Sequence, residues 1–448
     1  MLATASASAV SAWFDLKAGT PQGGVLSPFF FLVKTAPIWS SRRSCLLQFF
    51  ADDMSVAPPA GIHGADGDKA LNRGLDMIAY DLRMSKFSLE HLKCVVVSFS
   101  LRVARPLPIV IEGVVLKRAE RVKYLGVLLN STWSWSDHVA YMLGVITSKL
   151  KSIAKHISAS SPRWPIVVLL FKALIMPRPV YGMPVFAPTP AESAKMATCI
   201  AKGIYKILGI SGNASTMMVL QDNGLLSPAL EFELTALRYA HRLWLARTLR
   251  NPAATALLSQ LRARPHPTLH AHATARSVLK AVALFGVEFD IDDDQFKVKS
   301  LRKTALTEQR RRFLASPARS PDEKVRKALL PADKPAEFYK VAKRAGIATL
   351  SAFRYNRLQL NHLTWGAGRL AHCRRCPGTS ESVKHVLLSC PQYAVARAEC
   401  QRDLAAIGAR LDHSTLLAGV EYLPQDQRRR ALRVIVKYLD VIRRIRRV

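Results

Sequence analysis

Two adjacent aspartates, Asp52 and Asp53, follow an apolar run in the stretch LLQFFADDMSVAP, residues 46–58. Two ionised carboxylates this close repel each other, and burial would raise the pKa of at least one of them unless a cation neutralises the pair. A divalent ion resolves this conflict, and Mg²⁺ prefers one or two carboxylates together with phosphate oxygens and water. The alternative is a solvent-facing acidic turn, which is the commoner setting for two adjacent aspartates.

A second group of metal-binding residue types lies near the end of the chain. It has the pattern C-x2-C-x8-H-x4-C and consists of Cys373, Cys376, His385 and Cys390. Three thiolates and one imidazole suit tetrahedral zinc, and a tight turn can present the first two sulfurs to one ion. The last gap places the histidine and the final cysteine about one helical turn apart. The alternative is reduced cysteines without metal. Cys400 and His372 are interpreted as bystanders, and His372 could substitute in a shifted ligand set.

The elements around the aspartates should place them at a turn. The run LLQFFA is apolar and aromatic enough for a buried strand, and MSVAP begins a return strand that Pro58 ends. Upstream, residues 18–31 read AGTPQGGVLSPFFF, a glycine-lined loop followed by a helix start with Ser27 as N-cap and Pro28 at the first position. Such a loop suits the phosphate or sugar of a nucleotide.

Together these two stretches resemble the second and third palm motifs of reverse transcriptases from non-LTR (LINE-type) retrotransposons. The resemblance implies that Asp52 and Asp53 belong to the metal-binding carboxylates of a polymerase that uses Mg²⁺ or Mn²⁺. It also implies that one loop positions the template and the incoming nucleotide. The loop residues are Gly19, Pro21, Gln22, Gly23 and Gly24.

The resemblance continues downstream in the same order. Residues 71–100 contain an apolar helical repeat, which leads into the strand-like run VVVSF; the repeat is formed by Leu71, Leu75, Ile78 and Leu82. This is similar to the family's next motif, in which a lysine near the strand start, here Lys93, offsets charge on the leaving pyrophosphate or gives it a proton. The alternative for Lys93 is a solvated surface lysine.

The run YLGV resembles the hairpin that carries the primer grip in these enzymes, and the alternative is a plain core hairpin. Its residues are Tyr124, Leu125, Gly126 and Val127. The chain then becomes helical from Ser136, with apolar residues on one face and lysines on the other, which resembles the helical thumb. A basic helix pair there could bind the phosphates of a template–primer duplex.

Basic residues outnumber acidic ones, because 65 Lys and Arg stand against 32 Asp and Glu and give a formal charge of +33. This imbalance predicts polyanion partners, with nucleic acid first, and the alternative is charge that only keeps a large protein soluble. No apolar run approaches the roughly 20 residues that span a bilayer, so we expect no membrane partner. The cysteine segment also resembles the C-terminal cysteine–histidine segment of LINE-type proteins, which implies binding to the element's RNA or target DNA.

The predicted fold class is α+β. We expect a partial polymerase palm with an antiparallel sheet over residues 1–135 and a helical thumb and connection over 136–250. A basic linker region is predicted over 251–345, and a zinc segment with basic C-terminal helices over 346–448. The resemblance implies an RNA template, a DNA primer or target and deoxynucleoside triphosphates as partners, and a nuclear location with a cytoplasmic ribonucleoprotein stage.

Polymerase chemistry with two metals needs carboxylates from two places in the palm. The family's first motif, an aspartate in a strand some tens of residues before the glycine loop, is expected upstream of Gly19, and Asp15 lies too close to the loop to fill that role. We therefore interpret the chain as the C-terminal part of an RNA-directed DNA polymerase whose activity alone is in question. The alternatives are a non-enzymatic, zinc-containing nucleic-acid-binding remnant, and a product that does not fold stably because half a palm sheet leaves an edge unprotected.

Overall fold

The structure, a computed structural model, describes only part of the chain. The described residues are 24–40, 45–59, 61–99, 106–132, 134–160, 162–182, 188–209, 215–245, 278–283, 301–316, 338–341, 344–355, 372–418, 420 and 422–447. The chain divides into two compact units: Met1–Tyr124 with Leu129–Ser134, and Leu125–Leu128 with Trp135–Val448.

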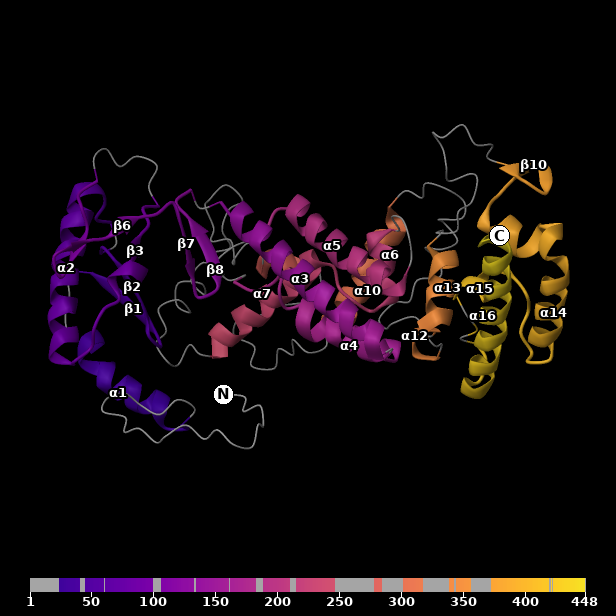
Figure 1. The fold of residues 1–448 in the computed structure, drawn as a ribbon, viewed down its shortest axis with the longest axis horizontal. Helices are drawn as coiled ribbons and strands as arrows, with labels where there is room; N and C mark the ends of the chain where they lie inside the picture. The colour runs from indigo at the N-terminus through magenta and orange to yellow at the C-terminus, as the bar shows by residue number, and fades with distance from the viewer. Residues whose placement is uncertain are drawn as a thin grey trace, which may run out of the picture. The chain divides into compact units, whose positions relative to one another are not determined.

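The described residues of the first unit combine helices with short strands, as Figure 1 shows. Its elements are α1 (Ser27–Ser40), β1 (Leu46–Phe50), β2 (Asp53–Ala57), α2 (Gly64–Met84), the 3-10 helix η1 (His91–Lys93), β3 (Val95–Val96), β4 (Val110–Ile111), β5 (Val114–Val115), β6 (Lys117–Arg118) and β7 (Arg121–Tyr124). The pairs β1–β2 and β4–β5 are antiparallel, and β3 pairs with β6 in parallel. The strand predicted from VVVSF is confined to Val95–Val96.

Helix α2 supplies much of the core of the first unit. Leu75, Ile78 and Leu82 are buried as the helical repeat predicts, and they pack in one cluster with Ile109 and Ile111 of the β4 segment. Polar side chains of the same helix fix the backbone on the way to β4. Asp68 accepts from the Leu107 amide at 2.9 Å and Asn72 accepts from the Val110 amide at 2.9 Å.

The hairpin β1–β2 buries one face only. Leu47, Phe49, Met54 and Val56 pack against the core of the first unit. The alternate residues Leu46 and Phe50 are 55% and 63% exposed, so the prediction that LLQFFA forms a buried strand is wrong for that face. The reason is the period of two in a strand, which turns successive side chains to opposite faces: Leu47 and Phe49 face the core of the first unit, whereas Leu46 and Phe50 face away from it.

The second unit is mostly helical. Its first elements are α3 (Ser136–Ser160), α4 (Trp164–Leu170), the π-helix η2 (Phe171–Ile175), α5 (Pro190–Leu208), α6 (Thr216–Asp222), α7 (Pro228–Leu245) and α10 (Leu301–Ala315). Its later elements are α12 (Phe338–Val341), α13 (Arg344–Arg354), β9 (His372–Cys373), β10 (Cys376–Ser380), the π-helix η6 (His385–Ser389), the 3-10 helix η7 (Pro391–Tyr393), α14 (Ala394–Ala405), α15 (His413–Ala418) and α16 (Gln425–Arg447). Strand β8 (Val127–Asn130) follows β7 and forms a hairpin with it.

One hydrophobic core joins the predicted thumb to the predicted zinc segment. It runs from Ile146 and Leu150 of α3, through α5, to Leu387 and to Ile435 of α16. The last helix lies beside α14 and α13 (Figure 1), with Leu432, Ile435 and Leu439 buried. The apolar face of the tail therefore packs on the zinc segment. Of its arginines, Arg443 donates to Thr349 and Arg446 pairs with Glu381, whereas Arg433 and Arg444 are exposed.

Local sequence signals account for the bounds of α5. Thr189 and Glu192 form a capping box, in which the Thr189 hydroxyl accepts from the Glu192 amide at 3.2 Å and the Glu192 carboxylate accepts from the Thr189 amide at 2.8 Å. Pro190 occupies the first helical position. The helix ends at Gly209, whose φ of 67° is the left-handed conformation that glycine adopts without a Cβ penalty.

A buried ion pair connects α6 to α13. The guanidinium of Arg354 donates to both carboxylate oxygens of Asp222, at 2.6 and 2.7 Å, and to the carbonyl oxygen of Leu417 at 2.6 Å. The two side chains are 1% and 0% exposed. Because each charge is buried and satisfied by the other, removing one leaves the other unpaired in the core.

The predicted α+β class is confirmed, since long helices combine with small sheets. Among the described residues, no helix has the length and apolar content that crossing a membrane requires. Within the range 251–345, predicted to be a linker region, the structure describes α10. Its residues Leu301, Ala305 and Leu306 are buried against α7. The four predicted domain ranges stay predictions.

Replacing Arg354 by Met should lower the free energy of unfolding by about 3 to 5 kcal/mol, because Asp222 would stay charged and unpaired in the core. The double variant Asp222→Leu with Arg354→Met should lose less than this single variant, since neither charge remains. Urea unfolding followed by tryptophan fluorescence measures both, and Arg402→Met on the exposed face of α14 serves as the control. A loss below about 1 kcal/mol for Arg354→Met would show that the pair is not needed for stability.

Candidate functional site

The predicted catalytic aspartates lie at the tip of the β1–β2 hairpin. Asp52 is in the turn, and Asp53 is the first residue of β2, opposite Phe50. Ala51 precedes them with a φ of 53°, a left-handed conformation that makes the turn tight. Both aspartates are exposed, which is the setting of the alternative, a solvent-facing acidic turn, and their binding of a metal ion stays a prediction.

The glycine loop lies mostly outside the described residues. Gly19, Pro21, Gln22 and Gly23 are in that part, and only Gly24 is described. The carbonyl oxygen of Gly24 accepts from the Ser27 amide at 3.1 Å at the start of α1. The helix begins at Ser27, whereas the prediction made Ser27 the N-cap and Pro28 the first helical residue. A difference of one residue is within the usual variation of helix ends. The placement of the loop against the aspartates stays a prediction.

Tyr124 links the predicted primer-grip hairpin to the aspartate hairpin inside the first unit. Its hydroxyl donates to the Ser55 hydroxyl oxygen at 3.2 Å, and Ser55 is two residues after Asp53 on β2. The structure therefore brings these two predicted site segments together. Lys93 lies exposed in η1, just before β3, and its role at the leaving pyrophosphate stays a prediction.

The turn of the predicted primer-grip hairpin consists of Leu125 and Gly126, with φ values of 47° and 81°. Two successive positive φ values are typical of the two-residue turns that join antiparallel strands. Val127, the first residue of β8, is buried. Both turn residues belong to the second unit, together with the side chains that contact them.

Two side chains contact the backbone of this hairpin from outside it. The hydroxyl of Tyr181 donates to the Leu125 carbonyl oxygen at 2.6 Å, and Nδ1 of His138 accepts from the Leu128 amide at 3.2 Å. His138 is fully buried, and burial lowers the pKa of its imidazole. The sequence signal that points to the histidine is its position two residues into the helix that follows the YLGV hairpin; the tyrosine gives no comparable signal.

The four predicted zinc ligands come together. One ligand atom from each of Cys373, Cys376, His385 and Cys390 lies within 4.8 Å of every other. The sulfurs of Cys373 and Cys390 are 3.9 Å apart. Zinc–sulfur bonds of about 2.3 Å in a tetrahedron require sulfurs about 3.8 Å apart, so this pair already has the spacing of a zinc site.

Local backbone geometry explains how the pattern converges. Cys373 and Cys376 are paired across the β9–β10 hairpin, with two arginines in its turn. The π-helix η6 carries His385, and the amide of Cys390 donates to the His385 carbonyl oxygen at 2.8 Å. This bond spans five residues, so the wide turn of a π-helix brings the last two ligands to the same side. His372 and Cys400 are not in the cluster, as predicted for bystanders.

The surroundings of the cluster suit a structural metal site. Burial raises the pKa of the Cys390 thiol to about 11 and lowers the pKa of His385. The buried Nε2 of His385 has no hydrogen-bond partner. Buried polar atoms are rarely left without one, and a bound metal ion would satisfy this nitrogen. Arg397 donates to the Cys390 carbonyl oxygen at 3.0 Å and so holds the backbone of a ligand residue. These residues fit zinc.

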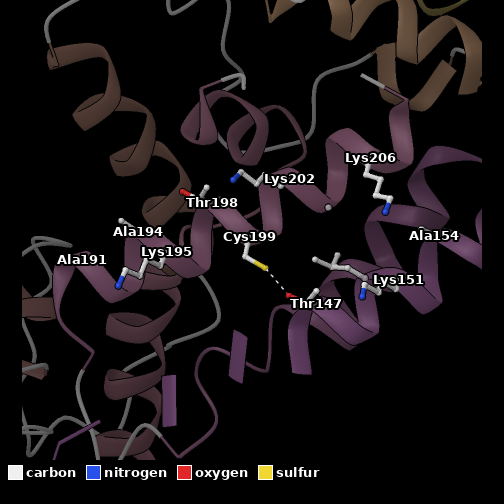
Figure 2. A pocket seen from close by; sticks show the side chains of 12 residues that line it. Thr147, Lys151, Ala154, Ala191, Ala194, Lys195, Thr198, Cys199, Lys202 and Lys206 are labelled. Carbon is white, nitrogen blue, oxygen red and sulfur yellow. Dashed lines mark hydrogen bonds between the residues drawn. The ribbon is translucent and has the colours of Figure 1, made fainter. Parts of the chain in front are cut away.

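A groove runs between α3 and α5 in the second unit (Figure 2) and has a volume of about 800 Å³. Its floor is apolar or small, with Leu150, Ala154 and Gly203 among the lining residues. Four lysines and no Asp or Glu line it: Lys151, Lys195, Lys202 and Lys206. Figure 2 shows Cys199 of α5 facing Thr147 of α3 across the groove, with the sulfur and hydroxyl oxygen 3.5 Å apart.

Part of the chain is similar in sequence to known proteins. No protein-family model matches the chain. The chain is 26% identical over 213 residues to a probable RNA-directed DNA polymerase from transposon X-element of Drosophila melanogaster, which covers 45% of the chain and 23% of that relative. It is 27% identical over 133 residues, 28% of the chain, to a probable RNA-directed DNA polymerase from transposon BS of the same organism, and spans 15% of that protein.

The chain therefore spans less than a quarter of the length of these relatives. The similarity confirms the resemblance to a portion of a non-LTR reverse transcriptase.

Zinc affinity should rise steeply with pH, because each ligand thiol must lose a proton before it binds the ion. Burial raises the pKa of Cys390, so this thiol is protonated at pH 7, whereas His385, with its lowered pKa, is already neutral. Between about pH 6.5 and 8 the logarithm of the apparent association constant should rise by up to about three per pH unit. Competition titration with a chromophoric chelator measures this, with Cys390→Ser as the variant that loses zinc and Cys94→Ser as the control. A pH-independent affinity would contradict thiolate ligation.

Proposed function

We propose that this chain carries part of an RNA-directed DNA polymerase, in which Asp52 and Asp53 hold Mg²⁺ or Mn²⁺ at the primer end. The proposal is supported by two exposed carboxylates at one hairpin tip in a strongly basic protein, and by the similarity to polymerases from transposons. The metal would polarise the phosphate of the incoming nucleotide and favour attack by the primer hydroxyl.

The residues of the chain have distinct roles in this proposal. The exposed aspartates orient a hydrated ion through their carboxylate oxygens, and the rest of its coordination comes from phosphate and water. The β7–β8 turn holds the primer end, and the hydrogen bond from Tyr124 to Ser55 keeps its first strand beside the aspartate hairpin. Lys93 offsets charge on pyrophosphate as it leaves.

The lysine-lined groove between α3 and α5 is the proposed contact for the phosphate backbone of the template–primer. Four ammonium groups attract a polyanion, and no lining carboxylate opposes them. Such contacts position a duplex without reading its sequence. The zinc segment, with exposed Arg374, Arg375 and Lys384, is proposed as a second nucleic-acid contact.

Asp52→Asn and Asp53→Asn should each reduce primer extension by about a hundredfold or more, because metal-ion stabilisation of the transferred phosphoryl group is worth several kcal/mol. Extension of a DNA primer on an RNA template with Mg²⁺ or Mn²⁺ measures this. Asp76→Asn is the matched control, since Asp76 is an exposed aspartate on α2. Wild-type chain without extension, but with salt-sensitive RNA binding that zinc chelation abolishes, would support the non-enzymatic remnant instead.

Replacing both Lys202 and Lys206 by Gln should weaken the salt dependence of binding to an RNA–DNA duplex. The slope of log K against log salt concentration is negative, and its magnitude should fall by about two. Each lost phosphate contact accounts for about 0.9 of slope. Fluorescence anisotropy over a range of salt concentrations measures it. The control is Lys149→Gln with Lys155→Gln, which removes the same charge from exposed positions of α3 outside the groove. Equal slopes for the two double variants would place the duplex elsewhere.

A further inference from the structure

The turn of the β7–β8 hairpin has two features that disfavour it in isolation. Leu125 has a φ of 47°, a left-handed conformation that residues other than glycine rarely adopt. The hairpin is also short, and an isolated two-stranded hairpin is marginally stable in water. Contacts from outside the hairpin must therefore select this turn.

Tyr181 supplies two such contacts. Its hydroxyl donates to the Leu125 carbonyl oxygen at 2.6 Å, which fixes the peptide that joins the two turn residues. Its ring occupies the space beside Gly126, where an added Cβ would lie 2.9 Å from Cε1 of the tyrosine. Gly126 also has a φ of 81°, so this position excludes a side chain on two grounds. Tyr181 is anchored in turn by its amide, which donates to the Arg178 carbonyl oxygen at 3.1 Å.

His138 holds the other side of the turn. It lies fully buried at the start of α3, and Nδ1 accepts the Leu128 amide at 3.2 Å, directly after the first residue of β8. An imidazole accepts a hydrogen bond only when it is neutral. Burial lowers the pKa of His138 and so favours the neutral form, while a hydrogen bond with the backbone of Tyr181 raises the pKa by a smaller amount. The turn, the histidine and the tyrosine thus belong to one set of contacts within the second unit.

We propose that Tyr181 and His138 are positioning residues that hold the Leu125–Gly126 turn in the conformation that places the primer end. This inference rests on the proposed polymerase function. Neither side chain touches the reacting atoms in this account. The tyrosine acts through the Leu125 carbonyl and the Gly126 backbone, and the histidine through the Leu128 amide. The consequence is that helix α3 and the segment after η2 determine the conformation of this turn.

Tyr181→Phe is the sharpest test, because it keeps the ring beside Gly126 and removes only the donor to Leu125. The rate of the first nucleotide addition should fall about three- to tenfold, which is the loss of one hydrogen bond, while the affinity for the template–primer and the KM for the nucleotide stay unchanged. Gly126→Ala should lower the rate further, since it moves the ring and strains the turn. Tyr422→Phe, an exposed tyrosine of the same unit, is the control. The melting temperatures of the two Phe variants should match that of the wild-type chain.

A second measurement separates this inference from the polymerase function. A template–primer with 2-aminopurine at the primer 3′ end reports by fluorescence how the end is held, without any need for catalysis. Tyr181→Phe should change the bound signal, and Tyr422→Phe should not. If the wild-type chain gives no extension, the proposed function fails; a changed signal in Tyr181→Phe then still supports the positioning role. An unchanged signal and an unchanged rate in Tyr181→Phe overturn it, and so does a wild-type signal equal to that of the free primer.

Discussion

The buried pair of Asp222 and Arg354 is the constraint on which the second unit depends. It joins the end of α6 to the end of α13, two segments 132 residues apart in the chain. Around it, the indole of Trp164 donates to the Asn223 side-chain oxygen at 2.8 Å and stacks on Tyr339, whose hydroxyl lies 2.7 Å from that of Tyr355. Such a network is stable only when every polar group finds a partner, so it specifies one arrangement of the helices that meet there. The predicted thumb and the predicted zinc segment consequently share one core.

The sequence was informative where short-range patterns carry the structure. The acidic hairpin tip, the buried repeat of α2 and the four converging zinc ligands all follow from spacings of a few residues. It was less informative where the outcome depends on what covers a surface. An apolar run such as LLQFFA does not reveal whether both faces of its strand are covered, and here Leu46 and Phe50 stay exposed.

Long-range polar contacts were beyond the reach of spacing arguments. Nothing in the residues near Arg354 predicts a carboxylate 132 positions earlier, and nothing near Tyr181 predicts a carbonyl on a turn 56 positions earlier. The π-helix η6 was predicted in part. The spacing indicated about one helical turn between His385 and Cys390, and the structure shows that this turn is a wider π-turn, which brings the two ligands together. The resemblance to a polymerase supplied the roles of the glycine loop and of Lys93, which no contact described here tests.

The two candidate metal sites differ in how many ligands the protein supplies. One is closed, with every ligand from the protein, and the other is open, with positions left for water or substrate. The cysteine–histidine cluster supplies four ligands from one short segment, and most of them are buried, so zinc there would be complete without any substrate. The aspartate pair supplies two exposed carboxylates, which leave most positions of a magnesium ion to phosphate and water. An ion held this loosely binds firmly only when a nucleotide brings its phosphates, because the coordination is then shared between protein and substrate. In the proposed polymerase, the exposure of Asp52 and Asp53 would tie metal binding to the presence of substrate, whereas burial of the cysteines would tie zinc to the fold.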